Sequence, residues 1–274
     1  MAQEISDAIG LDVVRLGTTA DADEIKGTAN AQPLIVAAGL MSAHALGATG
    51  SFSYVAGHSV GEITAAAIAG ALTPIDAMKL VRARGVEMAK AAGVTPSGMA
   101  AVLGGDRQVV LSAIADLGLV AANDNGGGQI VAAGDLDAIA QLAPVGARVR
   151  PLAVAGAFHT SYMQPAVEPL RALAATMTTS EPSVGVLSNK DGAVVKDGAE
   201  VLERIVNQIA NPVRWDLCME TLVSLGVTGV IEVAPAGTLV GLIKRAAPTI
   251  EQFAFKSPED LDAARAFVAN HGGK

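Results

Sequence analysis

The chain has 274 residues, of which 51% are hydrophobic and 3% are aromatic, and its formal net charge is −8 at pH 7. The negative charge argues against nucleic acid or an anionic membrane surface as the main partner. The length fits one large α/β domain, or one domain that carries an insertion. The single cysteine, Cys218, cannot form an internal disulfide, which fits a reducing compartment. We expect it to be a small buried residue in the helix after Trp215.

The N-terminal part of the chain predicts neither a signal peptide nor a membrane span. Residues 1–7 are acidic in balance and lack the basic region and apolar core of a secretory signal. The longest alanine-rich stretch, 33–48, contains Ser42 and His44 and is too short to cross a bilayer. We expect a helix over 33–46 and a soluble cytoplasmic protein.

The segment Gly57-His58-Ser59-Val60-Gly61 lies between an apolar run at 52–56 and a helix-forming stretch at 62–68. A strand, a Gly-x-Ser-x-Gly turn and a helix form a nucleophile elbow. Its two glycines are expected to permit the sharp turn. The turn points the Val60 N–H and the positive end of the helix at the reacting group. The pattern predicts Ser59 as a nucleophile; the alternative is a glycine-rich turn with a chance serine.

The next helix carries an arginine on its apolar face. Thr73 and Pro74 predict the helix start, and the helix is expected to end near Ala92. Arg84 falls in the middle of the apolar stripe formed by Ala77, Leu80, Val81 and Met88. A buried guanidinium is costly unless an anion meets it. If that anion is the neighbouring Glu87, Arg84 has a structural role. If it is a substrate carboxylate, Arg84 binds it through two hydrogen bonds as a clamp.

From residue 99 the chain alternates short helices and strands. The pattern predicts strand 99–103, helix 107–117, strand 119–122, a turn at 123–128, strand 129–133, helix 136–142 and strand 147–154. The order β-α-β-β-α-β is that of a split ferredoxin-like unit. We therefore expect a ferredoxin-like insertion over 93–154, within a larger α/β domain formed by 1–92 and 155–274.

The larger domain is expected to resume after the insertion. The pattern predicts helix 163–177, strand 184–187, helix 199–209, helix 215–225, strand 227–233 and a turn at 234–237.

A serine nucleophile needs a neighbouring base, usually histidine. Of the four histidines, His44 lies in an alanine-rich helix, and His58 is adjacent to Ser59 and should point to the opposite face. His271 lies in a tail that should fray. His159 lies in the loop after a strand, where α/β domains place their chemistry. His159 is therefore the expected base, and the alternative is a polar loop residue.

Six motifs occur in order along the chain: Gly57-His58-Ser59-Val60-Gly61-Glu62, Arg84-Gly85, Asn123-x-Asn125-x-x-x-Gln129-Ile130-Val131, His159, Asn211-Pro212-Val213-Arg214-Trp215 and Glu232-Val233-Ala234-Pro235. Together they resemble the malonyl-CoA:acyl-carrier-protein transacylase family of bacterial acyltransferases. Their order and spacing extend the resemblance over nearly the whole chain. The resemblance implies an α/β-hydrolase-like parallel-sheet core with a ferredoxin-like insertion.

The resemblance also implies a ping-pong transfer of malonyl from malonyl-CoA to the phosphopantetheine thiol of acyl carrier protein, for fatty-acid or polyketide synthesis, without a cofactor. Ser59 is the nucleophile, His159 the base and Arg84 the partner of the malonyl carboxylate. Val60 donates to the oxyanion, and a backbone carbonyl orients the histidine. Phe158 resembles the bulky residue that accompanies malonyl rather than methylmalonyl selection.

Asn125, from the third motif, is a further substrate-binding candidate. Because acyl carrier protein is acidic, basic groups are candidates for docking it: Lys190, Lys196, Arg204, Arg214, Lys244 and Arg245. The sequence departs from the family pattern at its start. Family members begin with a strand and a Gly-Gln-Gly type motif, and residues 1–3 do not match it. The departure predicts exposed strand edges and, if an oxyanion donor is lost, a rate lower by about 10²–10³-fold.

Two other functions stay open from the sequence. An α/β-hydrolase-type esterase or thioesterase places its histidine late in the chain, and the only late histidine here is His271. An inactive, truncated paralogue would keep the fold and leave Ser59 unreactive.

Overall fold

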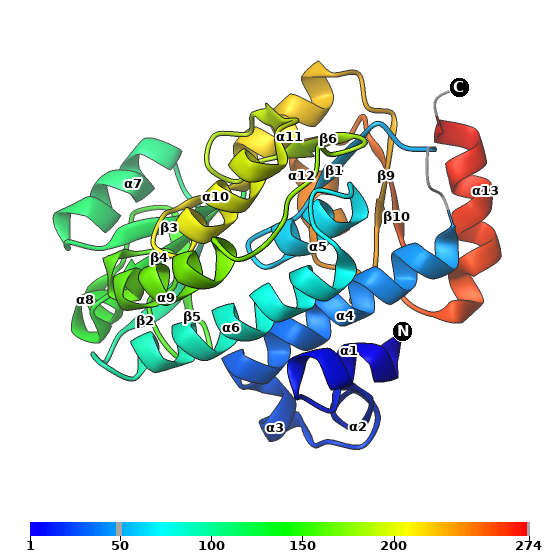
Figure 1. Cartoon of the computed structure of the whole chain (residues 1–274). Coiled ribbons are helices and arrows are strands. Elements are labelled where there is room, and N and C mark those ends of the chain that lie inside the picture. Colours follow the sequence, from blue (N-terminus) through cyan, green and yellow to red (C-terminus); the bar gives the residue numbers. More distant parts are fainter. Residues whose placement is uncertain (48–50, 273–274) are drawn as a thin grey trace.

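The computed structural model describes residues 1–47 and 51–272 and shows a mixed α/β fold (Figure 1). The helices are α1 Ala2–Ile9, α2 Val13–Thr18, α3 Ala22–Lys26, α4 Thr28–Leu46, α5 Gly61–Ile68, α6 Pro74–Ala92, α7 Arg107–Asp116, α8 Leu136–Gln141, α9 Gln164–Ala174, α10 Gly198–Gln208, α11 Trp215–Ser224, α12 Leu239–Ala246 and α13 Leu261–His271. The strands are β1 Tyr54–Ala56, β2 Gly98–Gly104, β3 Val120–Asp124, β4 Gln129–Gly134, β5 Ala147–Pro151, β6 Gly185–Leu187, β7 Val194–Val195, β8 Val213–Arg214, β9 Gly229–Glu232 and β10 Glu251–Ala254.

Parallel pairing occurs in the part of the chain that carries the elbow. β1 pairs with β6 in parallel, with Ala56 opposite Leu187, and β7 adds an antiparallel strand to this pair. β9 and β10 form a second parallel pair. Among the described residues these are two separate small sheets. The three strands predicted here are all present, but each is shorter than the apolar run that predicted it.

Two long helices, α4 and α6, lie side by side across the molecule (Figure 1). α4 begins at Thr28, earlier than expected, and continues through Pro33. Proline has no N–H to bond the Ala29 carbonyl, and this carbonyl instead accepts the Arg82 Nη1–H at 2.9 Å. At Gly85 a Cβ would lie 3.0 Å from the Thr28 carbonyl oxygen, so a glycine there lets the two helices approach closely.

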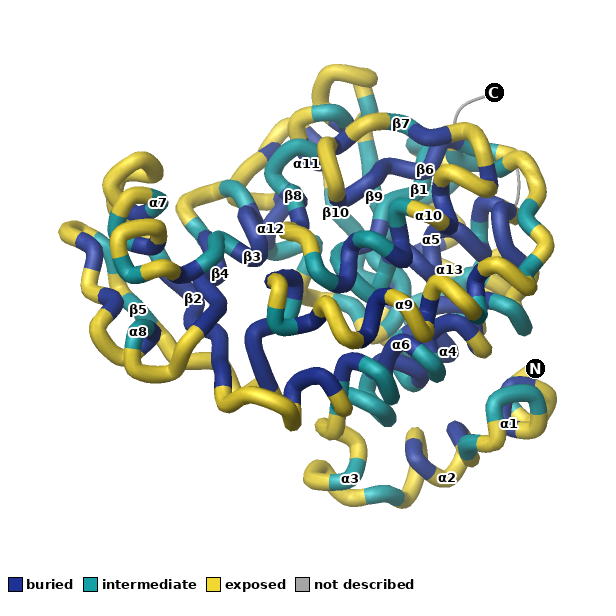
Figure 2. Tube along the Cα trace, turned by 60° about the vertical axis from the view of Figure 1, so that its left-hand side comes forward, coloured by how far each residue is buried: buried dark blue, intermediate teal, exposed yellow. Residues whose placement is uncertain are grey.

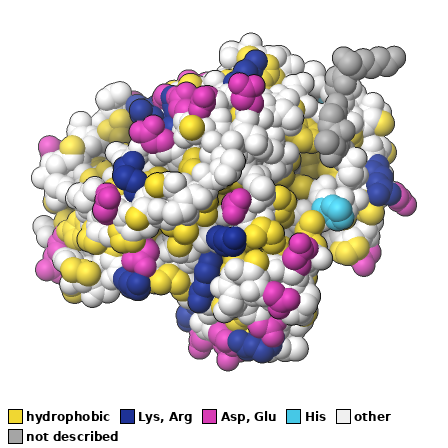
Figure 3. Space-filling model, viewed as in Figure 1, with side chains coloured by type: hydrophobic (Ala, Val, Ile, Leu, Met, Phe, Trp, Pro, Cys, Tyr) yellow, Lys and Arg dark blue, Asp and Glu magenta, His cyan; other side chains and the backbone are white. Residues whose placement is uncertain are grey.

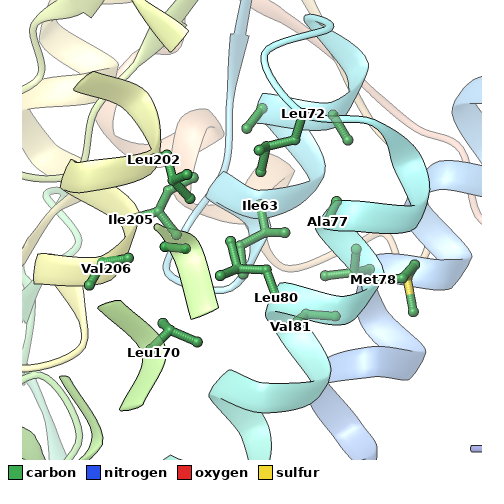
Figure 4. Packing of buried hydrophobic residues seen from close by; sticks show 14 of the residues in the cluster. Ile63, Leu72, Ala77, Met78, Leu80, Val81, Leu170, Leu202, Ile205 and Val206 are labelled. Atoms are coloured by element: carbon green, nitrogen blue, oxygen red, sulfur yellow. The ribbon is translucent and has the colours of Figure 1, made fainter. Parts of the chain in front are cut away.

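The main core lies where α5, α6, α9 and α10 meet. Figure 4 shows Ile63 of α5 and Leu80 of α6 close to Ile205 of α10 and Leu170 of α9. All four side chains are at most 1% exposed. The core brings together helices that are far apart in the sequence, and it fixes the positions of the polar side chains that the same helices carry.

The segment predicted as an insertion forms its own sheet, with strand order β5-β2-β4-β3-β8. β2 pairs antiparallel with β4 and β5, and β3 pairs antiparallel with β4. The six predicted elements occur in the predicted order. β8, from the later part of the chain, joins this sheet in parallel with β3. This strand was not predicted, because two residues carry no periodic pattern.

The ends of the chain contain structure that the sequence analysis did not predict. α1, α2 and α3 precede α4, and α12, β10 and α13 follow the last predicted strand. Figure 2 shows that α2 and α3 are mostly exposed, which explains their weak apolar pattern. The expectation that His271 frays was wrong: it ends α13, and its Nδ1 lies 3.0 Å from the Thr228 hydroxyl. Residues 273–274 of that tail lie outside the described residues.

The surface charges, the helix lengths and the position of the single cysteine can be compared with the expectations from composition. Figure 3 shows acidic and basic side chains interspersed over the visible face. Within residues 1–47 and 51–272, no helix combines the length and the apolar character that crossing a membrane requires. Cys218 is fully buried in α11, as predicted, and its Sγ–H donates to the Ser188 carbonyl at 3.3 Å.

Candidate active site

Ser59 occupies a strand–turn–helix junction, as the sequence predicted. β1 ends at Ala56, α5 begins at Gly61, and Ser59 has a φ of 52°. A Cβ at Gly57 would lie 2.0 Å from the Gly61 carbonyl group, so this position requires glycine. A Cβ at Gly61 would meet nothing within 4 Å. The expectation that the turn needs both glycines was wrong, because only the first faces backbone.

His159 lies against this serine. Its Nε2 is 2.7 Å from Ser59 Oγ, and its Nδ1 is 2.9 Å from the Gln208 backbone carbonyl. A carbonyl oxygen only accepts, so Nδ1 carries the proton and Nε2 is free to accept the proton of the serine hydroxyl. Gln208 thus supplies the carbonyl that the family resemblance implied. This is the geometry of a nucleophile with its base.

Both members of this pair have strained backbones. His159 has a φ of 61°, and within the described residues it and Ser59 are the two non-glycine residues with positive φ. Such conformations cost free energy and persist only where the surrounding structure enforces them. Here the His159 N–H donates to the Ile209 carbonyl at 3.1 Å. Strain at both positions supports a functional reason for holding the two side chains together.

The Asn189 side chain holds the turn around Ser59. This residue follows β6 and is fully buried. Its Oδ1 accepts the Ser59 N–H at 2.7 Å, and its Nδ2 donates to the Gly57 carbonyl at 2.8 Å. One amide therefore bonds the backbone on both sides of His58. This pairing satisfies buried peptide groups that the sharp turn leaves without secondary-structure partners.

Arg84 is 1% exposed and points at the serine, not at Glu87. Its Nη2 donates to Ser59 Oγ at 3.2 Å and to Gln208 Oε1 at 2.9 Å, and its Nη1 donates to Gln32 Oε1 at 2.5 Å. Glu87 instead pairs with Lys90 at 2.6 Å. Glu87 is therefore not the partner of Arg84, whose polar partners are two neutral amides and the serine hydroxyl.

The other residues predicted for the site surround this centre. Within the described residues no carbonyl accepts the Val60 N–H, so this N–H is available to an oxyanion. Phe158 is partly buried and packs against Met99 and other core residues beside His159. The Asn125 Oδ1 lies 2.8 Å from His58 Nε2 and links the loop between β3 and β4 to the serine turn. The substrate contacts of Asn125 and Phe158 stay predictions.

The remaining histidines and several basic groups are placed elsewhere. His44 is exposed on α4, and His58 packs edge-on against the Trp215 ring at 5.7 Å. Arg204 forms ion pairs with Asp191 and Glu200, and Arg214 forms one with Asp216. These two arginines are therefore weaker docking candidates than the lysines at 190, 196 and 244.

Four site residues were missed by the sequence analysis: Gln32, Glu62, Asn189 and Gln208. They lie on α4, α5, the turn after β6 and the end of α10. Gln208 and Glu62 stand in predicted helices, and a polar residue on an apolar helix face was a usable signal there. Asn189 and Gln32 gave no such signal, because their contacts join segments far apart in the sequence.

Burial sets the protonation state of the histidine. Burial, together with a smaller contribution from the charge of Arg84, lowers the pKa of His159 to about 3. A lowered pKa keeps the imidazole neutral, and thus able to accept a proton, at mildly acidic pH. The pKa of His58 is also lowered, mainly by burial.

We expect the rate at which a fluorophosphonate probe labels Ser59 to stay level from about pH 8 to about pH 5.5. An imidazole with the ordinary pKa of about 6.5 would lose about tenfold over the same range, because its neutral fraction falls. The measurement is the labelling rate against pH, with circular dichroism checking the fold at each point. A midpoint near the ordinary value would contradict the assignment of a buried neutral base.

The fold and the geometry of the site define a class of enzyme. A mixed α/β chain with a histidine bonded to a serine at a strand–turn–helix junction has the arrangement of enzymes that transfer acyl groups through a serine. Within residues 1–47 and 51–272, no group of three or more His, Cys, Asp or Glu side chains is placed to hold a metal ion. The arrangement offers a nucleophile, a neutral base and a fixed cation in one site.

Comparison with known proteins identifies the family. The acyl transferase domain model matches residues 1–259. The malonyl CoA-acyl carrier protein transacylase of Mycolicibacterium smegmatis is 52% identical over 263 residues, covering 92% of this chain and 91% of that protein. The chain therefore belongs to the acyl transferase family, among the malonyl CoA-acyl carrier protein transacylases.

Solved structures agree with this assignment. A crystal structure of MCAT from Mycobacterium tuberculosis matches with a TM-score of 0.93 at 50% identity, covering 96% of this chain and 90% of that one. A structure of a type II PKS acyl-carrier protein in complex with its malonyl-transacylase matches with a TM-score of 0.89 at 28% identity, covering 97% and 89%.

Proposed function

We propose that the chain transfers a malonyl group from malonyl-CoA to the phosphopantetheine thiol of acyl carrier protein. The observation that carries the proposal is the contact of one hydroxyl, Ser59 Oγ, with both a neutral imidazole and a buried guanidinium. The first is needed to form an acyl-serine, and the second recognises an acyl group that ends in a carboxylate. The family and its named relatives support the same activity.

The first half-reaction loads the serine. Ser59 Oγ attacks the thioester carbonyl while His159 Nε2 accepts the hydroxyl proton, and the Gln208 carbonyl stabilises the imidazolium through Nδ1–H. The negative charge on the carbonyl oxygen is stabilised by the Val60 N–H and the first turn of α5. When the C–S bond breaks, His159 returns the proton to the leaving thiolate, giving malonyl-serine and free CoA.

The second half-reaction runs the same steps in reverse on a different thiol. The phosphopantetheine thiol of the carrier protein gives its proton to His159, and its sulfur attacks the malonyl-serine carbonyl. The C–O bond to Ser59 breaks, and His159 returns the proton to the serine oxygen. The transfer needs no electron acceptor, so the residues named here suffice and we propose that no cofactor takes part.

Arg84 is proposed to hold the malonyl carboxylate. Its Nε–H is buried and has no hydrogen-bond partner among the described residues. A buried donor without a partner costs free energy, and an arriving carboxylate oxygen would remove that cost. Burial lowers the pKa of Arg84 to about 10, and the charge of Glu62 opposes this shift, so the guanidinium is still charged at neutral pH.

The finer architecture is part of the proposal. We infer an α/β-hydrolase-like core over 1–92 and 155–274 and a ferredoxin-like insertion over 93–154, supported by the separate apolar cluster around Val102 and Ile130. Phe158 and Asn125 are proposed to line the acyl and CoA path. A cytoplasmic location is proposed because fatty-acid or polyketide precursors of this kind are CoA esters of that compartment.

An acyl-transfer assay tests the function. With malonyl-CoA alone, we expect a burst of free CoA that matches the amount of enzyme, followed by slow release, because water deacylates the serine poorly. Adding carrier protein that bears its phosphopantetheine arm should restore continuous release and give malonyl-carrier by mass spectrometry. Continuous CoA release without carrier would identify a thioesterase instead, and no burst with no labelling of Ser59 would identify an inactive protein.

A further inference from the structure

Glu62 is a buried carboxylate that the transfer steps do not use. It lies on α5, one turn after Ser59, and is 3% exposed. Its Oε1 accepts the Asn189 backbone N–H at 2.6 Å, and its Oε2 accepts from the Gln208 side-chain amide. A carboxylate at this depth is costly unless it is hydrogen-bonded and its charge is compensated. The chain keeps an acid here against that cost.

The compensating charge comes from the site itself. The cations that face Glu62 are Arg84 of α6 and Arg204 of α10, and Cys218 of α11 is the other titratable group near it. Arg204 already forms ion pairs with two acidic side chains. Among the described residues Arg84 contacts no carboxylate, and Glu62 is the acid whose charge acts on its guanidinium. The side-chain amide of Gln208 lies between the two groups and bonds both.

That amide belongs to Gln208, and its two ends are chemically different. Its Nε2 donates to Glu62 and lies 3.2 Å from the Ser59 carbonyl oxygen and 3.1 Å from Asn189 Oδ1. Its Oε1 accepts from Arg84 Nη2 at 2.9 Å. The nitrogen therefore faces acceptors only, and the oxygen faces the guanidinium. An ionised carboxylate can only accept, so Glu62 joins the two other acceptors in holding the nitrogen end of the amide and thereby keeps the oxygen end toward Arg84.

Resting on the proposed function, we propose that Glu62 is a positioning residue for acyl-group selection. Its carboxylate orients the Gln208 amide, and the oriented amide holds the Arg84 guanidinium where the substrate carboxylate binds. A neutral acid or amide at position 62 has one acceptor end where the carboxylate has two, so when that end stays on the Asn189 N–H a donor faces Gln208 Nε2. The two donors would repel each other, and the Gln208 amide oxygen would move away from the Arg84 guanidinium. Asn189 would keep its bond, so the serine turn itself is not the part affected.

A purely electrostatic role for Glu62 would change the ratio of malonyl to acetyl loading in the opposite direction. If the carboxylate acted only as a nearby negative charge, removing that charge would make the field at Arg84 more positive and would favour an anionic acyl group. If it acts by orientation, removing the charge weakens the hold on the anionic acyl group. The ratio of malonyl loading to acetyl loading of Ser59 separates the two, because acetyl makes no demand on Arg84.

The test is the Glu62→Gln variant, measured by single-turnover loading of Ser59 from malonyl-CoA and from acetyl-CoA. We expect the malonyl-to-acetyl ratio to fall by about tenfold or more, the loss typical of one hydrogen bond to a charged group. A ratio that is unchanged or higher would overturn the proposal. The matched control is Glu232→Gln, since Glu232 accepts backbone N–H groups of Gly237, Leu239 and Val240 and should leave the ratio unchanged.

A second measurement follows the malonyl-to-acetyl ratio of the unmodified chain with pH and uses Glu62→Gln as its control. Burial raises the pKa of Glu62 to about 7, so the carboxylate becomes protonated as the pH falls through that value. We expect the malonyl-to-acetyl ratio of the unmodified chain to decrease from about pH 8.5 to about pH 6, and to be level with pH in Glu62→Gln. A ratio that rises as the pH falls would overturn the proposal. Failure of the proposed function would look different, as absent malonyl loading of the unmodified chain.

Discussion

Replacing Ser59 by alanine is expected to abolish the acyl-enzyme and to lower malonyl transfer by about 10⁴-fold or more. The reason is that, within residues 1–47 and 51–272, no other nucleophile contacts His159 Nε2. Cys218 cannot substitute, because burial raises the pKa of its thiol to about 12 and its Sγ–H bonds the Ser188 carbonyl. The measurement is the intact mass of the protein after incubation with malonyl-CoA.

Ser183→Ala is the control for this experiment. Ser183 is exposed, and its hydroxyl donates to the Ala69 carbonyl at 3.0 Å, outside the site. This variant also loses a serine hydroxyl and its hydrogen bond, and it should gain malonyl like the unmodified chain. A Ser59→Ala protein that still carries malonyl would show that the nucleophile has been assigned to the wrong residue.

Replacing Arg84 by alanine is expected to cause a loss that depends on the acyl group. Malonyl loading should fall by about 10²-fold or more, as when one partner of a buried charge pair is removed. Acetyl loading should persist or improve, since acetyl has no carboxylate for the guanidinium to bind. The measurement is the loading rate of Ser59 from each CoA ester, together with the melting temperature, because Gln32 and Gln208 lose a buried partner.

Arg82→Ala is the matched control for this variant. Arg82 lies on the same helix and donates to the Ala29 carbonyl, so its loss also removes a guanidinium that links α6 to α4. It does not contact Ser59, and the malonyl-to-acetyl ratio should stay that of the unmodified chain. If Arg84→Ala slows malonyl and acetyl loading equally, Arg84 does not bind the malonyl carboxylate.

The local pattern of the sequence predicted the three groups that the structure brings together, Ser59, His159 and Arg84. The strand before Ser59, the glycine before it and the helix after it are determined by neighbours in the chain. Elimination among four histidines was sufficient for His159, because the alternatives stood in a helix, beside the serine or near the C-terminus. Arg84 was visible because a guanidinium on the apolar face of a helix contradicts the pattern around it. These inferences need only residue types and their periodicity.

Tertiary structure alone decided how these groups are held. Three groups come from segments that are distant in the sequence from the turn at Ser59. They are the Gln208 carbonyl that orients His159, the Asn189 side chain that bonds the turn, and Gln32, which accepts from Arg84. Hydrogen bonds between such segments depend on how α4, α6 and α10 pack, and periodicity shows which face of a helix is buried but not which segment it packs against. The sequence by itself determined which side chains can react. The fold decided their protonation, orientation and partners, because those depend on distance and burial in three dimensions.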